Sequence, residues 1–296
     1  QIRKLEQQAD KIEKWLSENK KKTGANRKEL QRNVTDNNSA KMHTSHGTVQ
    51  GYNGQALVDS KHQVIVHGEA IGKGPDNDNL PTVIDGAKEN LERIGKSQDY
   101  FKGKIQTADS SYHSITNLNK CNQEKLDAYI PDNKFRNRDE RFSSRVGYRP
   151  RSKKFTFPDF RYDRKKDEYI CPNGKRLKRF VKPREYQGKL LRSYISKETD
   201  CRACRQRGKC LRYKDAKRRH FTFYADASGN NISQAMVTKI ETEKGRKIYP
   251  QRIAIVEPVF ANIRVHKRMD KFSLRGKLKV NIQWLLYCMV HNIGKV

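Results

Sequence analysis

Short apolar strands and amphipathic helices alternate between residues 48 and 131, and this order limits the folds open to the chain. Two strands are expected over Thr48–Asp59 and Gln63–Ala70, with a hairpin turn at Asp59–His62 between them. A helix is expected over Leu80–Ile94, because apolar residues recur there at three- and four-residue steps.

The alternation continues with a strand over Lys104–Asp109, a helix over Ser114–Gln123 and a strand over Leu126–Ile130. The order strand, strand, helix, strand, helix, strand is typical of an α/β sheet with helices packed on it. Two more helices are expected near the C-terminus, over Ile253–Arg268 and Val280–Ile293.

The N-terminal residues do not follow this pattern. Gln1 to about Lys22 predicts an amphipathic helix that lies on the main domain or on a partner. Residues 23–45 are polar without a period and are expected to form a loop. The absence of an initiator methionine indicates a fragment or a chain cut on its N-terminal side.

Two carboxylates stand at positions suited to phosphoryl-transfer chemistry. Asp109 ends a buried strand that turns at once into a helix, and Glu257 lies within the helix expected over Ile253–Arg268. A strand-end Asp and a helix-borne Glu can hold divalent metal ions. The simpler interpretations stay open, since such an Asp is often a helix N-cap and such a Glu is usually a surface charge.

The charge of the chain indicates a polyanionic partner. The 296 residues carry 64 Lys and Arg against 33 Asp and Glu, a net charge of +31. From Asp132 to His220 the count is 31 basic against 11 acidic residues. Such a field attracts nucleic acid. This segment is either a solvated, disordered insertion or an insertion that contacts DNA.

Aromatic residues within the basic segment favour contact with DNA over disorder, because disordered segments are usually poor in aromatics. They are Phe135, Phe142, Tyr148, Phe155, Phe157, Phe160, Tyr162 and Tyr169. No apolar run reaches the ~18 residues of a membrane span, so no membrane partner is expected. The charged N-terminal residues do not resemble a signal peptide. The eight histidines are scattered and none pairs at a convincing metal-ligand spacing.

Four of the six cysteines are grouped within the basic segment. Cys171 opens a Cys-Pro-Asn-Gly turn, Cys201 and Cys204 have the two-residue gap common in zinc sites, and Cys210 follows. These four thiols predict a structural zinc site, although reduced cysteines without metal remain an alternative and a disulfide is a weaker one. The other two, Cys121 and Cys288, lie in apolar helical patterns and are expected to be core thiols.

Several strings of residues, taken in order, resemble bacterial insertion-sequence transposases of the DDE class. The resemblance runs from about Val34 to the end of the chain. The strings are Asn33–Met42, Gly51–Asp59, Ala108–Ser114, Asp127–Phe142, Cys171–Gly174, Cys201–Cys204, Arg252–Phe260, Phe272–Lys277 and His291–Asn292.

The resemblance implies an RNase H-like catalytic domain, a mixed sheet flanked by helices, in which three acidic residues bind two Mg²⁺ or Mn²⁺ ions. The second acid corresponds to Asp109 and the third to Glu257. Tyr249 and Arg252 stand where the family has a tyrosine and an arginine ahead of the catalytic Glu. A basic residue one to two turns after that Glu corresponds to Arg264 or Lys267.

The first acid of the family is not identified in this sequence. Asp36 is expected in a loop and Asp59 in a hairpin turn, so neither resembles a ligand on a strand. In the relatives that strand comes before the segment with which this sequence begins. The resemblance therefore implies an N-terminally truncated chain.

Three segments are predicted: a helical arm at 1–32, a catalytic core made of 33–131 and 249–296, and a basic insertion with the candidate zinc site at 132–248. The residues expected to contact DNA are Arg136, Arg138, Lys175, Arg176, Arg202 and Arg205.

The expected function is metal-dependent DNA strand cleavage and strand transfer at the ends of an insertion sequence. The expected partners are the terminal repeats, the target DNA and further copies of the chain in a synaptic complex, in the cytoplasm at the nucleoid. A non-catalytic DNA-binding remnant and an RNase H-like metal-dependent nuclease are the alternatives.

Overall fold

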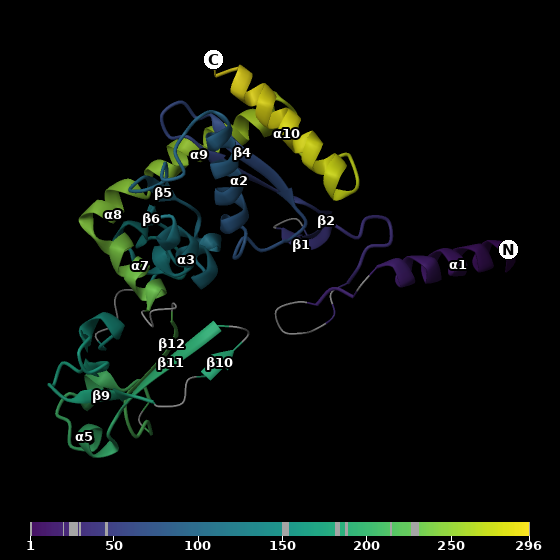
Figure 1. Ribbon diagram of the computed structural model, residues 1–296. Coiled ribbons are helices and arrows are strands. Elements are labelled where there is room, and N and C mark those ends of the chain that lie inside the picture. Colours follow the sequence, from purple (N-terminus) through teal and green to yellow (C-terminus); the bar gives the residue numbers. More distant parts are fainter. Residues whose placement is uncertain are drawn as a thin grey trace. The chain divides into compact units, whose positions relative to one another are not determined.

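A computed structural model shows a mixed α/β protein (Figure 1). The chain forms two compact units. Unit 1 comprises Gln1–Lys102 with Pro250–Val296, and unit 2 comprises Gly103–Tyr249. The predicted segments 1–32, 33–131 with 249–296, and 132–248 stay predictions. The structure describes residues 2–19, 21–23, 29, 31–44, 47–149, 154–180, 184–186, 189–213, 215–225 and 231–295.

Unit 1 contains two antiparallel strand pairs and several helices. Its elements are α1 (Ile2–Glu18), β1 (Ala40–Thr44), β2 (Gly47–Gly51), β3 (Asn53–Val58), β4 (Ile65–Ile71), α2 (Leu80–Arg93), α9 (Gln251–Ala261), the π-helix η4 (Asn262–His266) and α10 (Lys277–Ile293). The helices expected at residues 1–22, 80–94 and 280–293 are confirmed. The helix expected over residues 253–268 becomes α9 followed by η4.

Two strand predictions in unit 1 were wrong. The loop expected over residues 23–45 contains β1, which pairs with β2 in the register Met42↔Val49. The single strand expected over Thr48–Asp59 is divided at Tyr52, because β2 pairs with β1 whereas β3 pairs with β4. The polar residues of β1 form a strand through this pairing rather than through an apolar face.

The hairpin turn between β3 and β4 is confirmed. The Asp59 carboxylate accepts hydrogen bonds from the N–H groups of Lys61 (3.1 Å) and His62 (2.7 Å). Gln63 closes the turn with φ at 57°, in the left-handed region. The turn brings Val58 opposite Ile65.

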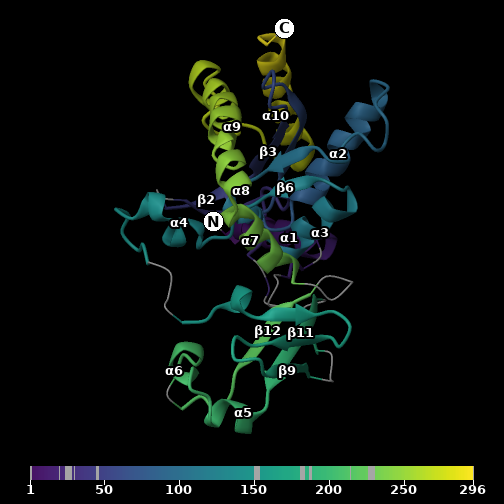
Figure 2. The same cartoon turned by 90° about the vertical axis from the view of Figure 1, so that its left-hand side faces the viewer.

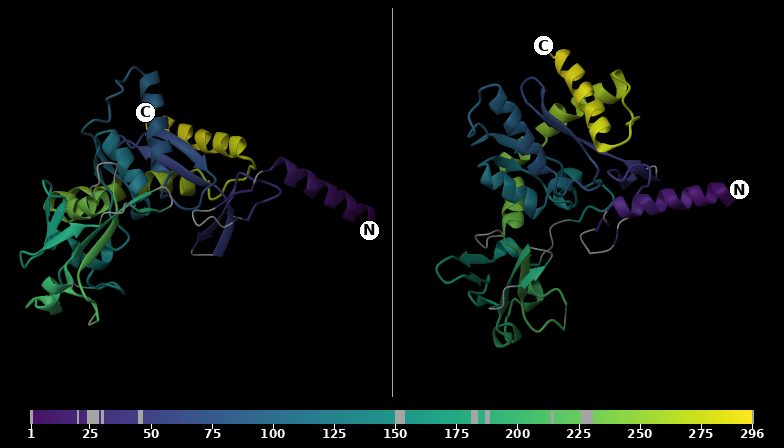
Figure 3. Two further views of the ribbon diagram at one scale, coloured as in Figure 1. Left: turned by 60° about the horizontal axis from the view of Figure 1, so that its bottom comes forward. Right: turned by 45° about the vertical axis from the view of Figure 1, so that its right-hand side comes forward.

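The core of unit 1 forms where α10 packs along the β3–β4 hairpin (Figure 3). The indole of Trp284 is 4% exposed and donates a hydrogen bond to the carbonyl of Gln55 at 2.8 Å. A Cβ on Gly68 would lie 2.9 Å from the Cys288 sulfur, and one on Gly54 would lie 3.3 Å from the indole. The hairpin therefore accepts the indole only because both strands carry glycine there.

Two helices of unit 1 present apolar side chains to solvent. No described residue of α1 is buried, and Ile2, Leu5, Ile12 and Leu16 are all exposed. The outward face of α10 is also apolar, with exposed Leu278, Ile282, Leu285, Leu286, Met289, Val290 and Ile293. A helix that is apolar on both sides normally packs on both sides.

Unit 2 begins with a strand–helix–strand arrangement. Its first elements are β5 (Ile105–Thr107), the 3₁₀ turn η1 (Ser110–Tyr112), α3 (Ile115–Gln123), β6 (Asp127–Tyr129), α4 (Phe135–Arg138) and the 3₁₀ turn η2 (Glu140–Phe142). β5 and β6 are parallel, with Thr107 opposite Tyr129. Both strands and α3 were predicted, and the chain returns to this part of unit 2 in α7 (Ile232–Glu241) and α8 (Glu243–Ile248).

The described residues from 154 to 224, which include most of the basic segment, form an antiparallel sheet with short helices (Figure 2). Its elements are η3 (Phe157–Asp159), β7 (Arg161–Asp163), β8 (Glu168–Ile170), β9 (Arg176–Arg179), β10 (Arg184–Tyr186), β11 (Lys189–Ser196), α5 (Glu198–Arg202), α6 (Arg207–Cys210) and β12 (His220–Tyr224). The strand order is β10-β11-β9-β8-β7, and β12 also pairs with β11.

This sheet has an aromatic core of its own. Phe160, Tyr169, Leu177, Tyr194 and Phe221 are buried together. Five of the eight aromatics that argued against disorder belong to this core, and the disordered alternative is wrong for them: Phe155, Phe157, Phe160, Tyr162 and Tyr169. The expected RNase H-like mixed sheet stays a prediction, since β3–β4 and β5–β6 are each two-stranded.

Candidate active site

Asp109 caps the turn that follows β5. Its Oδ1 accepts hydrogen bonds from the N–H and, at 3.1 Å, the hydroxyl of Ser110. The Asp109 carbonyl accepts from the N–H of Tyr112 at 3.0 Å, which closes the 3₁₀ turn η1. The N-cap interpretation of Asp109 is thus correct. Capping leaves the residue exposed at the end of a strand, and that position also suits a metal ligand.

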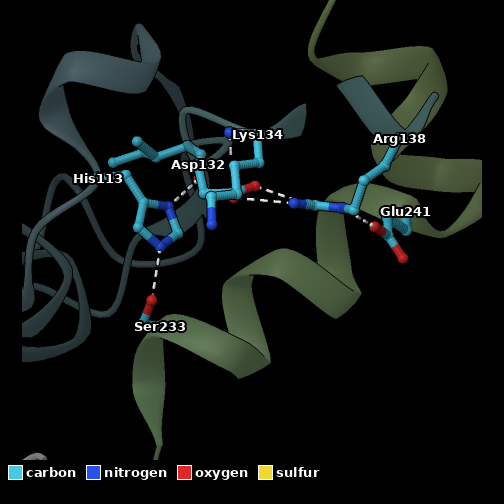
Figure 4. Close-up of polar contacts among 7 residues, drawn as sticks. His113, Asp132, Lys134, Arg138, Ser233 and Glu241 are labelled. Atoms are coloured by element: carbon cyan, nitrogen blue, oxygen red, sulfur yellow. Dashed lines mark hydrogen bonds and ion pairs between the residues drawn. The ribbon is translucent and has the colours of Figure 1, made fainter. Parts of the chain in front are cut away.

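His113 connects this turn to two other elements of unit 2 (Figure 4). Its Nδ1 lies 2.8 Å from the carbonyl oxygen of Ile130, just after β6, and its Nε2 lies 2.8 Å from the Ser233 hydroxyl in α7. The sequence did not predict this role. The one available signal was its position four residues after Asp109.

A second polar link joins the end of β6 to α7. Arg138 donates to both oxygens of Asp132, at 2.9 and 2.6 Å, and to Glu241 at 3.1 Å (Figure 4). Burial alone would raise the pKa of Asp132, but hydrogen bonding and charge from Arg138 outweigh burial and lower it. Asp132 therefore stays ionised and bound to Arg138.

Glu257 occupies the surface of α9 in unit 1. Its side chain is 58% exposed, and its Oε1 lies 3.3 Å from the Arg252 guanidinium in the same helix. Arg264 is exposed in η4, and Lys267 caps the end of η4 through its N–H. Tyr249, at the end of α8 in unit 2, packs edge-on against Phe135 with ring centroids 5.5 Å apart.

A proline directly follows Glu257 and interrupts the hydrogen bonding of α9. Pro258 has no N–H to donate to the carbonyl of Ala254, one turn earlier. The side-chain amide of Gln63 donates to that carbonyl instead, at 2.9 Å. Gln63, at the end of the β3–β4 turn, therefore holds α9 at a residue three positions before the candidate ligand Glu257.

The two rejected candidates for the first acid have other partners. Asp36 accepts from the Tyr52 hydroxyl at 2.7 Å and from the N–H of Gly276 at 2.8 Å, and it links the loop before β1 to the start of α10. Asp59 shapes the hairpin turn. The described residues contain no group of three or more His, Cys, Asp or Glu side chains arranged to hold a metal ion.

The four grouped cysteines lie near one another in unit 2. The predicted turn after Cys171 is present, with the N–H of Gly174 donating to the Cys171 carbonyl at 2.8 Å. Burial raises the pKa of the Cys210 thiol; Arg219 opposes this effect, and the neighbouring Cys201, Cys171 and Cys204 add to it. All six cysteines are free thiols. Cys121 and Cys288 are buried, as predicted.

The predicted DNA-contacting residues fall into two groups. Arg138 and Arg176 form multiple ion pairs within unit 2; Arg176 binds Asp163 (3.3 Å) and Glu168 (2.9 Å). The others are exposed: Arg136, Lys175, Arg202 and Arg205. Of these, Lys175 and Arg202 each form a single ion pair among the described residues, with Asp200 (4.0 Å) and Glu198 (3.0 Å). The second group is therefore better placed to meet a phosphate backbone. No helix among the described residues is long and apolar enough to cross a membrane.

One comparison with known proteins gave a match. Residues 170–296, somewhat less than half of the chain, match a family described as the transposase DDE domain. The matched segment includes the four grouped cysteines and Glu257. It supports a DDE-class transposase, in agreement with the resemblance of the strings that lie within this segment. The searches of curated proteins and of solved structures gave no match.

Proposed function

We propose that this DDE-class transposase chain contributes Asp109 and Glu257 to metal-dependent DNA strand cleavage and strand transfer at the ends of an insertion sequence. The observation that carries the proposal is that the family match covers α9, which bears Arg252 and Glu257. Asp109 lies outside the matched segment, and its support is its exposed place at the end of β5.

Carboxylates of this kind suit Mg²⁺ or Mn²⁺. The bound metals would activate a water or 3′-hydroxyl nucleophile and stabilise the leaving oxygen. Asp109 would hold its ligand oxygens at a fixed place because its own turn is hydrogen-bonded. Arg252 would orient the Glu257 carboxylate, and the exposed Arg264 would bind a DNA phosphate near the reacting bond.

The first acid is proposed to come from a strand outside this sequence. In the described part of the chain β3 pairs only with β4, and β5 only with β6. An RNase H-like mixed sheet requires further strands beyond these two pairs. The full reading frame should then encode an apolar strand that ends in Asp.

The four cysteines are proposed to bind a structural zinc. Four thiolates are a complete tetrahedral donor set, and Cys171 and Cys210 already pack against the aromatic core of the sheet. Because the described residues form no group arranged to hold a metal ion, zinc binding would require these thiols to rearrange. Metal analysis of protein purified without chelators should find about one zinc per chain. Cys201→Ser should lose it, while Cys121→Ser should keep it.

DNA is proposed as the partner, as terminal repeats and as target, with further copies of the chain in a synaptic complex at the nucleoid. The exposed Arg136, Lys175, Arg202 and Arg205, with a contribution from Arg138 and Arg176, would bind phosphates. Replacing the four exposed residues with Gln should weaken binding of any DNA sequence and make it less sensitive to salt.

The test uses protein expressed from its full reading frame and duplexes taken from the DNA that flanks it. Strand cleavage should require Mg²⁺ or Mn²⁺. Asp109→Asn and Glu257→Gln should each reduce it by more than about 100-fold while DNA binding is unchanged. The exposed carboxylates Asp99 and Glu92 provide the matched controls Asp99→Asn and Glu92→Gln, which should cleave normally.

The same experiment separates the alternatives. Full cleavage by Asp109→Asn or Glu257→Gln would contradict the site. Binding without cleavage by the full reading frame would indicate the non-catalytic remnant, which the unidentified first acid favours. Cleavage of RNA hybrids or junctions without preference for the flanking repeats would indicate the nuclease.

A further inference from the structure

The turn that carries Asp109 is short and closed by its own hydrogen bonds. The N–H of His113 donates to the Ser110 carbonyl at 3.1 Å, and Ser114 then caps α3 by accepting from the N–H of Asn117 at 3.2 Å. The Asn117 side chain is fully buried and donates to the carbonyl of Tyr112 at 2.9 Å. These hydrogen bonds join the turn and the start of α3 into one piece.

The His113 ring ties this piece to the rest of unit 2. A carbonyl can only accept, so the Nδ1 beside Ile130 donates to it, and Nε2 shares a second hydrogen bond with the Ser233 hydroxyl. One side chain thus joins the Asp109 turn to the end of β6 and to the first turn of α7 (Figure 4). Both contacts are 2.8 Å long.

The elements that receive His113 are themselves fixed to each other. Arg138 holds Asp132, two residues after Ile130, to Glu241 at the last turn of α7. Ser233 and Glu241 are eight residues apart, which is about 12 Å along a helix. α7 is therefore attached to the segment after β6 at its last turn without His113, and His113 adds a contact at its first turn.

We propose that His113 is a positioning residue for Asp109: it holds the turn so that the Asp109 carboxylate is aimed for metal binding. This inference rests on the proposed function. His113 does not touch the metal or the substrate in this role. It acts as the outer partner of a ligand, and loss of such a partner typically weakens metal binding by about 10–100-fold.

The test replaces each ring nitrogen separately. The amide of His113→Asn can keep the contact to Ile130, and that of His113→Gln the contact to Ser233, while His113→Ala loses both. The probe is Fe²⁺ with ascorbate and peroxide, which cuts the protein backbone beside a bound ion. His113→Ala should raise the Fe²⁺ concentration for half-maximal cutting near residue 109 by about tenfold, and the two amide variants by less. Ser233→Ala should match His113→Asn.

Melting temperatures and two further variants complete the test. A purely structural role would lower the melting temperature of the His113 variants and leave the half-maximal Fe²⁺ concentration unchanged, and that result would overturn the inference. His62→Ala, in the exposed β3–β4 turn, should change neither quantity. If His113→Ala does not fold, the Asn, Gln and Ser233→Ala variants decide.

Asp109→Asn separates this inference from the proposed function. It should abolish cutting near residue 109. Persistent cutting in Asp109→Asn would remove the proposed metal site altogether. Lost cutting in Asp109→Asn, together with an unchanged Fe²⁺ concentration for all His113 variants, would remove only the role of His113.

Discussion

Asp109 and Glu257 are both exposed carboxylates, but the protein holds them in different ways. Asp109 sits in a hydrogen-bonded turn that His113 attaches to β6 and α7. Glu257 projects from a helix and contacts Arg252 of the same helix at 3.3 Å. The position of Asp109 therefore depends on the neighbouring segments of unit 2, whereas that of Glu257 depends on how α9 itself is held.

The largest expected effect comes from breaking the support of α9. Trp284 is buried and stacks on Phe260 of α9, with ring centroids 6.1 Å apart. Trp284→Ala should lower the free energy of unfolding of unit 1 by about 3–5 kcal/mol. Hydrogen exchange should show lost protection in α9 and unchanged protection of the Asp109 turn. The exposed helix α1 offers the control Trp15→Ala, which should have a small effect.

The next effect concerns the proline break beside Glu257. Gln63→Asn tolerates the left-handed backbone but removes the donor to the Ala254 carbonyl. Because this hydrogen bond is exposed to water, its loss should lower the free energy of unfolding by about 0.5–1.5 kcal/mol. Adding Pro258→Ala supplies an N–H for that carbonyl and should restore most of the loss. A double variant as unstable as Gln63→Asn alone, in urea denaturation, would show that Gln63 stabilises α9 in another way.

Acid should weaken the Asp132–Arg138 ion pair, which links the segment after β6 to α7 in the support of the Asp109 turn. The pKa of Asp132 is lowered in the folded state, since Arg138 outweighs the effect of burial. This stabilisation is present above the unfolded value of about 3.9 and is lost as the pH falls below it towards the lower folded-state pKa. Asp132→Asn should therefore flatten the fall in urea midpoint below about pH 4. An unchanged slope in that variant would contradict the assignment.

The smallest effect is expected at the Arg252–Glu257 pair. Because Glu257 is 58% exposed, water screens the pair and it should stabilise the fold by less than about 1 kcal/mol. Glu257→Gln, which removes the charge at the exposed end of the pair, should change the melting temperature little. A loss above about 2 kcal/mol would mean that Glu257 is held as firmly as Asp109.

The sequence predicted the elements whose pattern is local. All five residues expected on the apolar face of α2 (Leu80, Val83, Ile84, Ala87 and Leu91) are buried. β1 was missed because its polar residues become a strand only beside β2. The position of Asp109 was likewise readable, since a strand that ends on a carboxylate is a short-range signal.

The supports of the two carboxylates could not be predicted, because their partners are far apart along the chain. Gln63 and Ala254 are 191 residues apart, and His113 and Ser233 are 120 apart. The excess of basic residues also gave no sign of the contacts that acidic residues make within the same segment. Asp167 accepts from the hydroxyls of Tyr162 (2.6 Å) and Tyr194 (2.5 Å), a pairing hidden within a segment that composition describes only as basic.

The glycines beneath Trp284 have a consequence for how variation in this protein is interpreted. Any side chain at Gly68 would meet the Cys288 sulfur, and one at Gly54 would press on the indole ring. In a scan of all single substitutions, both glycines should tolerate as few replacements as a metal-binding residue would. Neither glycine has a side chain that could bind a metal or DNA. If these two glycines are invariant among related sequences, the reason would therefore be the packing of the Trp284 indole against the β3–β4 hairpin.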